Sequence, residues 1–269
     1  MDEHGTAPAA LNTGVAHPAR VYDYLLGGKD NFAADRAAAE AGIAAAPEVR
    51  DIARANRAFL VRAVRFVAAD LGVRQFLDIG TGIPTSPNVH EVAQAVDPSA
   101  RVVYVDNDPI VAAHARALMA GPGQGVTGVV QADLRDPESV LAHKGVTGVL
   151  DLAQPVAVLL IAVLHHLTDA DDPAGVVAQL LAPLAPGSAL VFAHLGRDLR
   201  PDASGAVAGA ANRSAVTLVP RDRAQIEEIL AGVDLVDPGL VRLPRWRPVV
   251  DPDPELDRVW AYAAVGVKH

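Results

Sequence analysis

The chain contains no cysteine among its 269 residues. This absence excludes disulfide bonds, cysteine-ligated zinc, iron–sulfur clusters and a thiol nucleophile. It also favours a cytoplasmic location. We expect no secretory signal, because no apolar segment of the required kind follows Asp2 and Glu3.

Long hydrophobic runs and an excess of positive charge are also missing. The longest apolar run, residues 155–164, is far shorter than the roughly 20 residues that a membrane-spanning helix needs. The formal net charge is −9, so the protein has no general basic surface that would attract nucleic acid. We therefore expect no membrane or nucleic-acid partner, and a small molecule as the ligand. The sequence does not indicate an oligomeric state.

The first 74 residues contain three helical patterns. Pro18 suits the first turn of a helix that ends at Gly27. Asp30 or Asn31 can cap a second, alanine-rich helix that ends before Pro47. A third helix follows, with apolar residues at helical spacing. Its arginines are expected on a solvated face: Arg50, Arg54, Arg57 and Arg65.

After residue 74 the pattern changes to short apolar runs separated by helical stretches. Seven strands are expected, at residues 75–79, 101–106, 126–132, 155–164, 188–194, 233–236 and 258–267. Helical stretches between the first five predict parallel β-α-β units, and hence a doubly wound, mostly parallel α/β sheet. The last two strands are expected to pair antiparallel at the sheet edge, because only a proline-rich stretch joins them. Residues 196–220, rich in glycine and alanine, are expected to form an insertion.

A glycine turn follows the first strand. Asp78 lies near the end of that strand, and Gly80, Thr81 and Gly82 come directly after Ile79. Open α/β sheets bind ligands at the carboxyl ends of their strands, where glycine lets the backbone approach the ligand closely. A tight connection without a ligand is the alternative. A dinucleotide fingerprint would need a third glycine at position 85, which is Thr85, so the motif argues against NAD.

Carboxylates end the next two strands. Asp106 follows the second strand, where a carboxylate can accept hydrogen bonds from both ribose hydroxyls, although a capping role is the alternative. Asp108 before Pro109 is typical of a helix N-cap. After the third strand, Asp133 can accept a hydrogen bond from the adenine amino group while Leu134 covers the ring. An ordinary loop acid is the alternative for Asp133.

The fourth strand leads through Ala162 to the adjacent histidines His165 and His166. Neighbouring residues of a strand point to opposite faces, so these two side chains are not expected to bind one metal ion. No H-E-x-x-H motif is present either. We therefore expect no metal site.

Taken together, these strand ends resemble the class I S-adenosylmethionine (SAM)-dependent methyltransferases. Residues 78–82 match their glycine motif, Asp106 their ribose-binding acid and Asp133 their adenine-binding acid. Residues 17–32, 76–85, 88–91 and 103–108 resemble more closely an actinobacterial SAM methyltransferase family, formerly a domain of unknown function. That resemblance covers nearly the whole chain. One departure from the general pattern is Pro84, where many class I enzymes have a third glycine, so the following helix is expected to start late, near Asn88.

The resemblance implies that SAM is the cofactor and S-adenosylhomocysteine (SAH) the product. It implies cofactor contacts from the strand-end residues: Asp78, Gly80, Thr81, Gly82, Asp106, Asn107, Asp133, Leu134 and Ala162. Residues 75–269 then form the SAM-binding domain. Residues 1–74 form a helical lid, with a purely structural cap as the alternative. The lid residues expected near the acceptor are Tyr22, Lys29, Asp30, Asn31 and Phe32.

The function predicted in this way is methyl transfer from SAM to a small-molecule acceptor. His165 is the predicted base if the acceptor must lose a proton, since its ordinary pKa lies near neutrality. Two alternatives stay open, namely a non-catalytic SAM-binding regulator and an NAD(P)-dependent oxidoreductase. The acceptor itself cannot be identified from the sequence.

Overall fold

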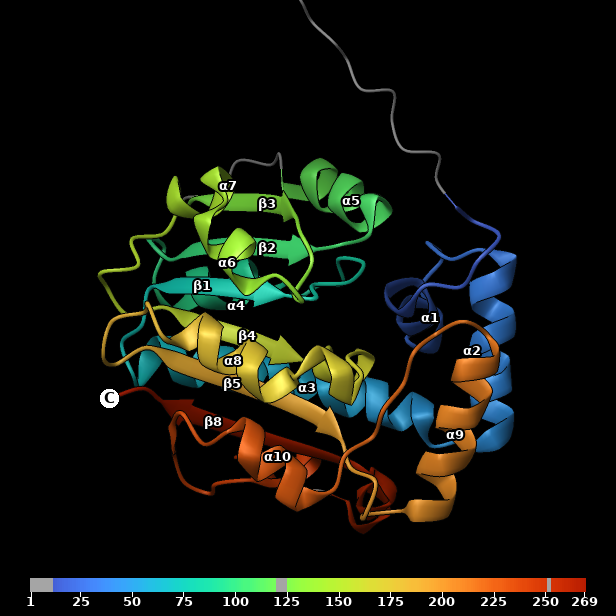
Figure 1. Cartoon of the computed structure of the whole chain (residues 1–269). Coiled ribbons are helices and arrows are strands. Elements are labelled where there is room, and N and C mark those ends of the chain that lie inside the picture. The colour runs from blue at the N-terminus through green and yellow to red at the C-terminus, as the bar shows by residue number, and fades with distance from the viewer. Residues whose placement is uncertain (1–11, 120–124, 251–252) are drawn as a thin grey trace, which may run out of the picture.

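The computed structural model describes residues 12–119, 125–250 and 253–269. Its centre is an eight-stranded sheet in the order β3-β2-β1-β4-β5-β8-β6, with β7 paired to β8 (Figure 1). The strands are β1 Gln75–Ile79, β2 Arg101–Asp106, β3 Thr127–Gln131, β4 Ala157–Ile161, β5 Ala189–Leu195, β6 Asp234–Leu235, β7 Val241–Arg242 and β8 Ala261–Val267. The first five are parallel, and β8 is antiparallel to β5, β6 and β7.

Helices cover both faces of the sheet and also the carboxyl ends of the parallel strands (Figure 1). The helices are α1 Pro18–Leu25, α2 Ala33–Ala45, α3 Val49–Ala69, α4 Val89–Val96, α5 Pro109–Met119, α6 Pro137–Ala142, α7 Lys144–Thr147, α8 Pro173–Leu181, α9 Pro201–Arg213 and α10 Arg223–Ile229. Short 3-10 turns lie at Leu164–His166, Asp169–Asp171, Leu243–Arg245 and Pro254–Arg258. Strands β4 and β5 are buried along their whole length, as expected of a sheet between two helical layers.

The predicted sheet agrees with the structure except at its antiparallel edge. The antiparallel pairing of the last two predicted strands is confirmed as β6 with β8. The prediction of seven strands missed β7, a strand of 2 residues that pairs with β8 from within the proline-rich stretch. A run this short has no alternation that a sequence pattern can reveal.

The structure adds one helix to the predictions and corrects the cap of another. The predicted insertion 196–220 follows β5 and contains a helix that the sequence did not predict, α9, which packs against α2. The cap of α2 is Phe32 rather than Asp30 or Asn31, and its N–H donates to the Asp35 carboxylate at 2.8 Å. The late start of the helix after the glycine turn is confirmed, since α4 begins after Asn88.

Helix α3 belongs to the same hydrophobic core as the sheet. Its Phe59 and Val64 are fully buried and share a core cluster with Phe76 of β1 and Trp246. The N-terminal segment is therefore not uniform, because α3 supports the sheet whereas α1 and α2 lie beyond the strand ends (Figure 1). Within the described residues, no helix has the length and apolar character needed to cross a membrane.

Candidate active site

A cavity of about 410 Å³ lies at the carboxyl ends of the parallel strands. Its opposite walls come from α1, α2 and α9, which stand beyond these strand ends in Figure 1, and from α3. A pocket of this size is typical of a small-molecule site. The predicted cofactor contacts all line it: Asp78, Gly80, Thr81, Gly82, Asp106, Asn107, Asp133, Leu134 and Ala162.

Gly80 makes the sharp turn after β1. Its φ is +73°, and a Cβ atom there would lie 2.3 Å from Cγ2 of Val163, so a larger residue does not fit without displacement. The N–H groups of Gly80 and Thr81 both donate to one carbonyl oxygen of β2, at 2.8 and 3.2 Å. Gly82 has a φ of +68°, and a Cβ atom there would come no closer than 4.0 Å to Ala19. The turn thus presents bare backbone to the cavity.

Asp106 stands at the end of β2 and is 8% exposed. Its Oδ2 atom accepts a hydrogen bond from the N–H of Gly82 at 2.9 Å, and its Oδ1 atom accepts one from the N–H of Asp108 at 2.9 Å. Burial raises the pKa of this carboxyl above its usual value. Since a carboxylate oxygen has two lone pairs, each oxygen still has one for a donor such as a ribose hydroxyl.

Asp78 and Arg57 bring opposite charges to the cavity on either side of the glycine turn. Burial raises the pKa of Asp78 to about 6, and its Oδ2 atom accepts a hydrogen bond from the Thr81 hydroxyl at 3.0 Å. The Nη2 atom of Arg57 donates to the carbonyl oxygens of Thr85 and Pro87, at 2.6 and 2.5 Å. The prediction that Arg57 lies on a solvated face is wrong, because this residue is half-buried and lines the cavity.

Asp133 is held by its neighbour Arg135. It accepts hydrogen bonds from the backbone N–H of Arg135 at 2.9 Å, from Nε at 3.0 Å and from Nη2 at 2.6 Å. The hydrogen bonds with Arg135 lower the pKa of Asp133 to about 2. Nδ2 of Asn107 lies 3.5 Å from the same carboxylate. Most of the acceptor capacity of Asp133 is thus occupied, whereas Leu134 gives the cavity an apolar surface.

Three histidines line the cavity near the end of β4. The strand ends at Ile161, and Leu164–His166 forms a 3-10 turn, so the prediction that His165 and His166 lie on opposite faces of a strand is wrong. Their ring centroids are 4.5 Å apart. The ring of His194 on β5 lies 5.4 Å from that of His165. In the described part of the chain, no group of three or more histidine, aspartate or glutamate side chains is arranged to hold a metal ion.

These histidines are neutral near pH 7. Burial lowers the pKa of His165 well below its usual value, that of His166 to about 4 and that of His194 to about 3. Nδ1 of His166 lies 2.7 Å from the carbonyl oxygen of Thr217. A carbonyl oxygen only accepts, so Nδ1 carries the proton and Nε2 the lone pair. Nδ1 of His165 is buried with no hydrogen-bond partner among the described residues.

Of the predicted lid residues, Tyr22 lines the cavity. Its hydroxyl donates to the carbonyl oxygen of Ala53 at 3.0 Å and accepts a hydrogen bond from Nδ2 of Asn56 at 2.9 Å. Burial raises the pKa of Tyr22 to about 12, so the side chain is neutral. Both of its partners lie on α3, and the hydroxyl therefore fixes α1 against α3.

The other predicted lid residues lie in the connection between α1 and α2, outside the described lining of the cavity: Lys29, Asp30, Asn31 and Phe32. Asp23 organises this connection. Its Oδ2 atom accepts hydrogen bonds from the Asp30 N–H at 3.0 Å and from Nδ2 of Asn31 at 2.8 Å. A Cβ atom at Gly28 would lie 2.0 Å from the same carboxylate. The glycine and polar residues of this motif thus shape a loop.

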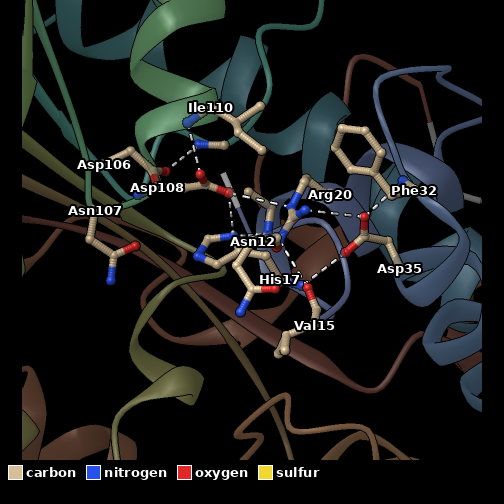
Figure 2. A network of polar contacts seen from close by, with 12 residues as sticks. Asn12, Val15, His17, Arg20, Phe32, Asp35, Asp106, Asn107, Asp108 and Ile110 are labelled. Carbon is tan, nitrogen blue, oxygen red and sulfur yellow. Dashed lines mark hydrogen bonds and ion pairs between the residues drawn. The ribbon is translucent and has the colours of Figure 1, made fainter. Parts of the chain in front are cut away.

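A buried ionic network joins α1, α2 and the loop after β2 (Figure 2). The side chains of Arg20, Asp35 and Asp108 are 4%, 0% and 5% exposed. Nε of Arg20 lies 3.4 Å from Oδ2 of Asp108, and its Nη1 lies 3.6 Å from Oδ2 of Asp35. Asp108 also accepts a hydrogen bond from the N–H of Ile110 at 2.8 Å, which is the predicted N-cap contact of α5. This Arg20 network ends two residues from Asp106 and ties the N-terminal helices to the cofactor loop.

Sequence reasoning missed several residues of the cavity wall. His194 is the second-last residue of β5 and could have been found by the strand-end rule that identified Asp106. Asn56 carries no such signal, because its partner Tyr22 lies on another helix. Arg20, which lies outside the described lining, carries none either, because Asp35 and Asp108 lie on another helix and on a loop.

The residues present fit SAM. Asp78 can pair with its ammonium group and Arg57 with its carboxylate. Asp106 can accept hydrogen bonds from its ribose hydroxyls, and Leu134 can cover its adenine ring. The glycine turn leaves room for the chain between these groups.

Comparisons with known proteins agree with this site. The S-adenosyl methyltransferase family matches residues 4–269 of the chain. The crystal structure of a DUF574 family protein from Streptomyces avermitilis is 43% identical, has a TM-score of 0.92, and covers 96% of this chain and 100% of that chain. That of a candidate methyltransferase from Thermobifida fusca is 40% identical, has a TM-score of 0.89, and covers 97% of this chain and 98% of that chain. No curated protein matches the chain.

These matches confirm the predicted family, and both relatives come from actinobacteria, as the resemblance implied. The fold is a doubly wound, mostly parallel α/β fold, and the activity is SAM-dependent methyl transfer. The chain therefore belongs to the S-adenosyl methyltransferase family, with S-adenosylmethionine as its cofactor.

Proposed function

We propose that this methyltransferase binds SAM in the strand-end part of the cavity and a small-molecule acceptor in the part that faces α1, α2, α3 and α9. The observation that carries the proposal is the carboxylate of Asp106, which is buried, lines the cavity and is held by two backbone N–H groups. Among the described residues, no arginine or lysine forms a salt bridge with it. A carboxylate in this state is suited to accept the two hydroxyls of a ribose.

In this arrangement Asp106 accepts hydrogen bonds from the ribose, and Leu134 covers the adenine. Asp133 accepts a hydrogen bond from the adenine amino group through a lone pair that Arg135 does not occupy. Asn107 and Ala162 border the cofactor from the loops after β2 and β4. At the other end, the ammonium group of SAM pairs with Asp78 and its carboxylate with Arg57. The hydroxyl of Thr81 holds Asp78 in place.

SAM supplies an activated methyl group, so the protein mainly has to align the acceptor and exclude water. Proximity and alignment of this kind can lower a barrier by roughly 7–11 kcal/mol. Where the acceptor must lose a proton, the neutral histidines of the turn after β4 can accept it, and His165 is the residue that the sequence predicts for this role.

We assign the lid to α1 and α2. Both helices contribute residues to the cavity wall, and the Arg20 network fixes them to the loop after β2. Helix α3, although part of the predicted segment 1–74, shares the core of the sheet and serves as a fixed wall. The residues from Lys29 to Phe32 act on this lid indirectly, by shaping the connection between its two helices.

The acidic net charge of −9 supports a small molecule rather than nucleic acid as the acceptor. The absence of cysteine supports a cytoplasmic location.

Calorimetric titrations of the full chain with SAM, SAH and NADH test the proposal. We expect SAM and SAH to bind at one site and NADH not to bind. Preferential binding of NADH would contradict the proposed site. A screen of small metabolites then separates an enzyme from a non-catalytic binder, because only an enzyme forms SAH when it is offered its acceptor.

A further inference from the structure

Arg57 of α3 is the one aspartate, glutamate, lysine or arginine that the helices contribute to the described lining of the cavity, and its guanidinium is bound to the loop after the glycine turn. Apolar and mostly short residues line the part of the cavity that faces the helices: Ala39 and Gly42 of α2, Ile52 of α3, Val207 and Ala211 of α9, and Trp260. The other charged lining residues lie at or just after the strand ends: Asp78, Asp106, Asp133 and Arg135. We call the apolar part, bounded by Ala39, Ile52, Ala211 and Trp260, the acceptor compartment.

Tyr22, His166 and His194, which also line the cavity, are neutral near pH 7. Burial raises the pKa of Tyr22 to about 12 and lowers the pKa of His166 to about 4 and that of His194 to about 3. An acceptor with a carboxylate, phosphate or ammonium group would lose its hydration in the acceptor compartment without gaining a counter-ion. The compartment therefore selects against charged molecules.

One hydrogen-bonding atom of the cavity wall, Nε2 of His166, can bind a ligand, and its protonation state follows from the structure. Because Nδ1 of His166 donates to the carbonyl oxygen of Thr217 at 2.7 Å, its Nε2 can only accept. The complementary group on a ligand is a donor. Alkyl amines do not qualify, since they are protonated and charged near pH 7. A hydroxyl qualifies, and it must lose its proton when its oxygen is methylated.

The lowered pKa of His166 makes its imidazole a weak base, and this restricts which hydroxyl can react. A phenol, with a pKa of about 10 like the tyrosine side chain, gives up its proton far more readily than water, with a pKa of about 15.7. The pKa of an aliphatic alcohol lies close to that of water. A neutral histidine can therefore assist a phenol much better than an alcohol.

We propose that the acceptor is a neutral phenol, whose ring lies in the acceptor compartment and whose hydroxyl donates to Nε2 of His166. Methylation forms a bond between the phenol oxygen and the methyl carbon while the bond from that carbon to sulfur breaks, and the electron pair stays on sulfur. The hydroxyl proton passes to Nε2 of His166, which takes the role predicted for His165. This proposal rests on the proposed function.

A set of ring-matched probes tests the proposal with the full chain. Phenols of one to three fused rings are compared with the carboxylic acids, arylamines and hydroxymethyl compounds on the same rings, in the presence of SAM. Methylated product and SAH are measured by mass spectrometry, and SAM binding by calorimetry. We expect methyl transfer to at least one phenol, at least tenfold faster than to any matched acid, amine or alcohol.

Preference for an acid, an amine or an alcohol overturns the phenol assignment but leaves the proposed methyl transfer intact. SAM binding without transfer to any phenol of the set also overturns it. Failure to bind SAM contradicts the proposed function itself.

Two pairs of variants test the compartment and the base with whichever phenol reacts. Ala211→Asp places a charge in the compartment and should raise the KM for the phenol at least tenfold with unchanged SAM affinity. Ala206→Asp, on the exposed face of the same helix, is its control and should behave like the wild type.

His166→Gln keeps a hydrogen-bond acceptor but cannot take the proton, so kcat should fall roughly 100-fold with little change in KM. His143→Gln is its control, because His143 caps α7 outside the described cavity lining. Wild-type kinetics for Ala211→Asp and His166→Gln would refute the proposal.

Discussion

Replacing Arg20 with methionine tests how the N-terminal helices are held over the cofactor loop. Methionine keeps much of the apolar stem of arginine but removes the guanidinium that lies between Asp35 and Asp108 (Figure 2). Loss of one partner from a buried ion pair typically costs about 3–5 kcal/mol, because the remaining charge stays desolvated.

The structure places the expected loss at the lower end of that range. Asp35 keeps hydrogen bonds from the backbone N–H groups of His17 at 2.9 Å and Phe32 at 2.8 Å, and Asp108 keeps the one from Ile110 at 2.8 Å. We therefore expect a loss of about 3 kcal/mol. For a domain of this size that corresponds to a decrease in Tm of about 6–12 °C. SAM affinity should also decrease, since the network ends beside Asp106.

Thermal and urea unfolding followed by circular dichroism measure the loss, with Arg54→Met as the matched control. The side chain of Arg54 is 65% exposed and pairs with Asp51 on the surface of α3, so its removal should cost less than about 1 kcal/mol. Equal stability of the two variants would refute this account of the network.

Three further predictions concern the cofactor site. Asp106→Asn should weaken SAM binding roughly 10- to 150-fold in calorimetry, because hydrogen bonds to a charged group are worth about 1.5–3 kcal/mol; unchanged affinity would remove the ribose assignment. SAM affinity should fall about tenfold per pH unit below pH 6, because the pKa of Asp78 is raised to about 6 and its protonated form cannot pair with an ammonium group. Asp78→Asn should bind SAM weakly and with no such pH dependence, and a persisting dependence would assign it to another group. Gly80→Ala should lower both Tm and SAM affinity, since its Cβ atom would lie 2.3 Å from the Val163 side chain, whereas Gly205→Ala has open space on α9 and should be neutral or stabilising by up to about 1 kcal/mol. Equal effects of the two glycine substitutions would argue against a tight turn at Gly80.

The strand-end residues could be predicted because they follow from topology. The apolar runs at residues 75–79 and 101–106, which carry Asp78 and Asp106 near their ends, predicted β1 and β2 with the bounds that the structure shows. Parallel strands bring their carboxyl ends to one edge of the sheet, so residues far apart in the sequence meet there.

The parts that escaped prediction depend on tertiary contacts. Helix α9 is rich in alanine and glycine and has no strong apolar periodicity, and its packing against α2 shows only in the folded chain. His165 and His166 were placed on a strand because the apolar run extends past Ile161, where the backbone instead enters a 3-10 turn. Arg57 looked solvated because its partners, two carbonyl oxygens of the loop after the glycine turn, have no sequence signature.

A crystal structure of the full chain with SAH tests the central claim most directly. We predict that both ribose hydroxyls of SAH lie within hydrogen-bond distance of the Asp106 carboxylate, with the adenine against Leu134 and the sulfur facing the acceptor compartment. SAH bound elsewhere, or a ribose that does not contact Asp106, would contradict the assignment of this cavity as the methyl-transfer site.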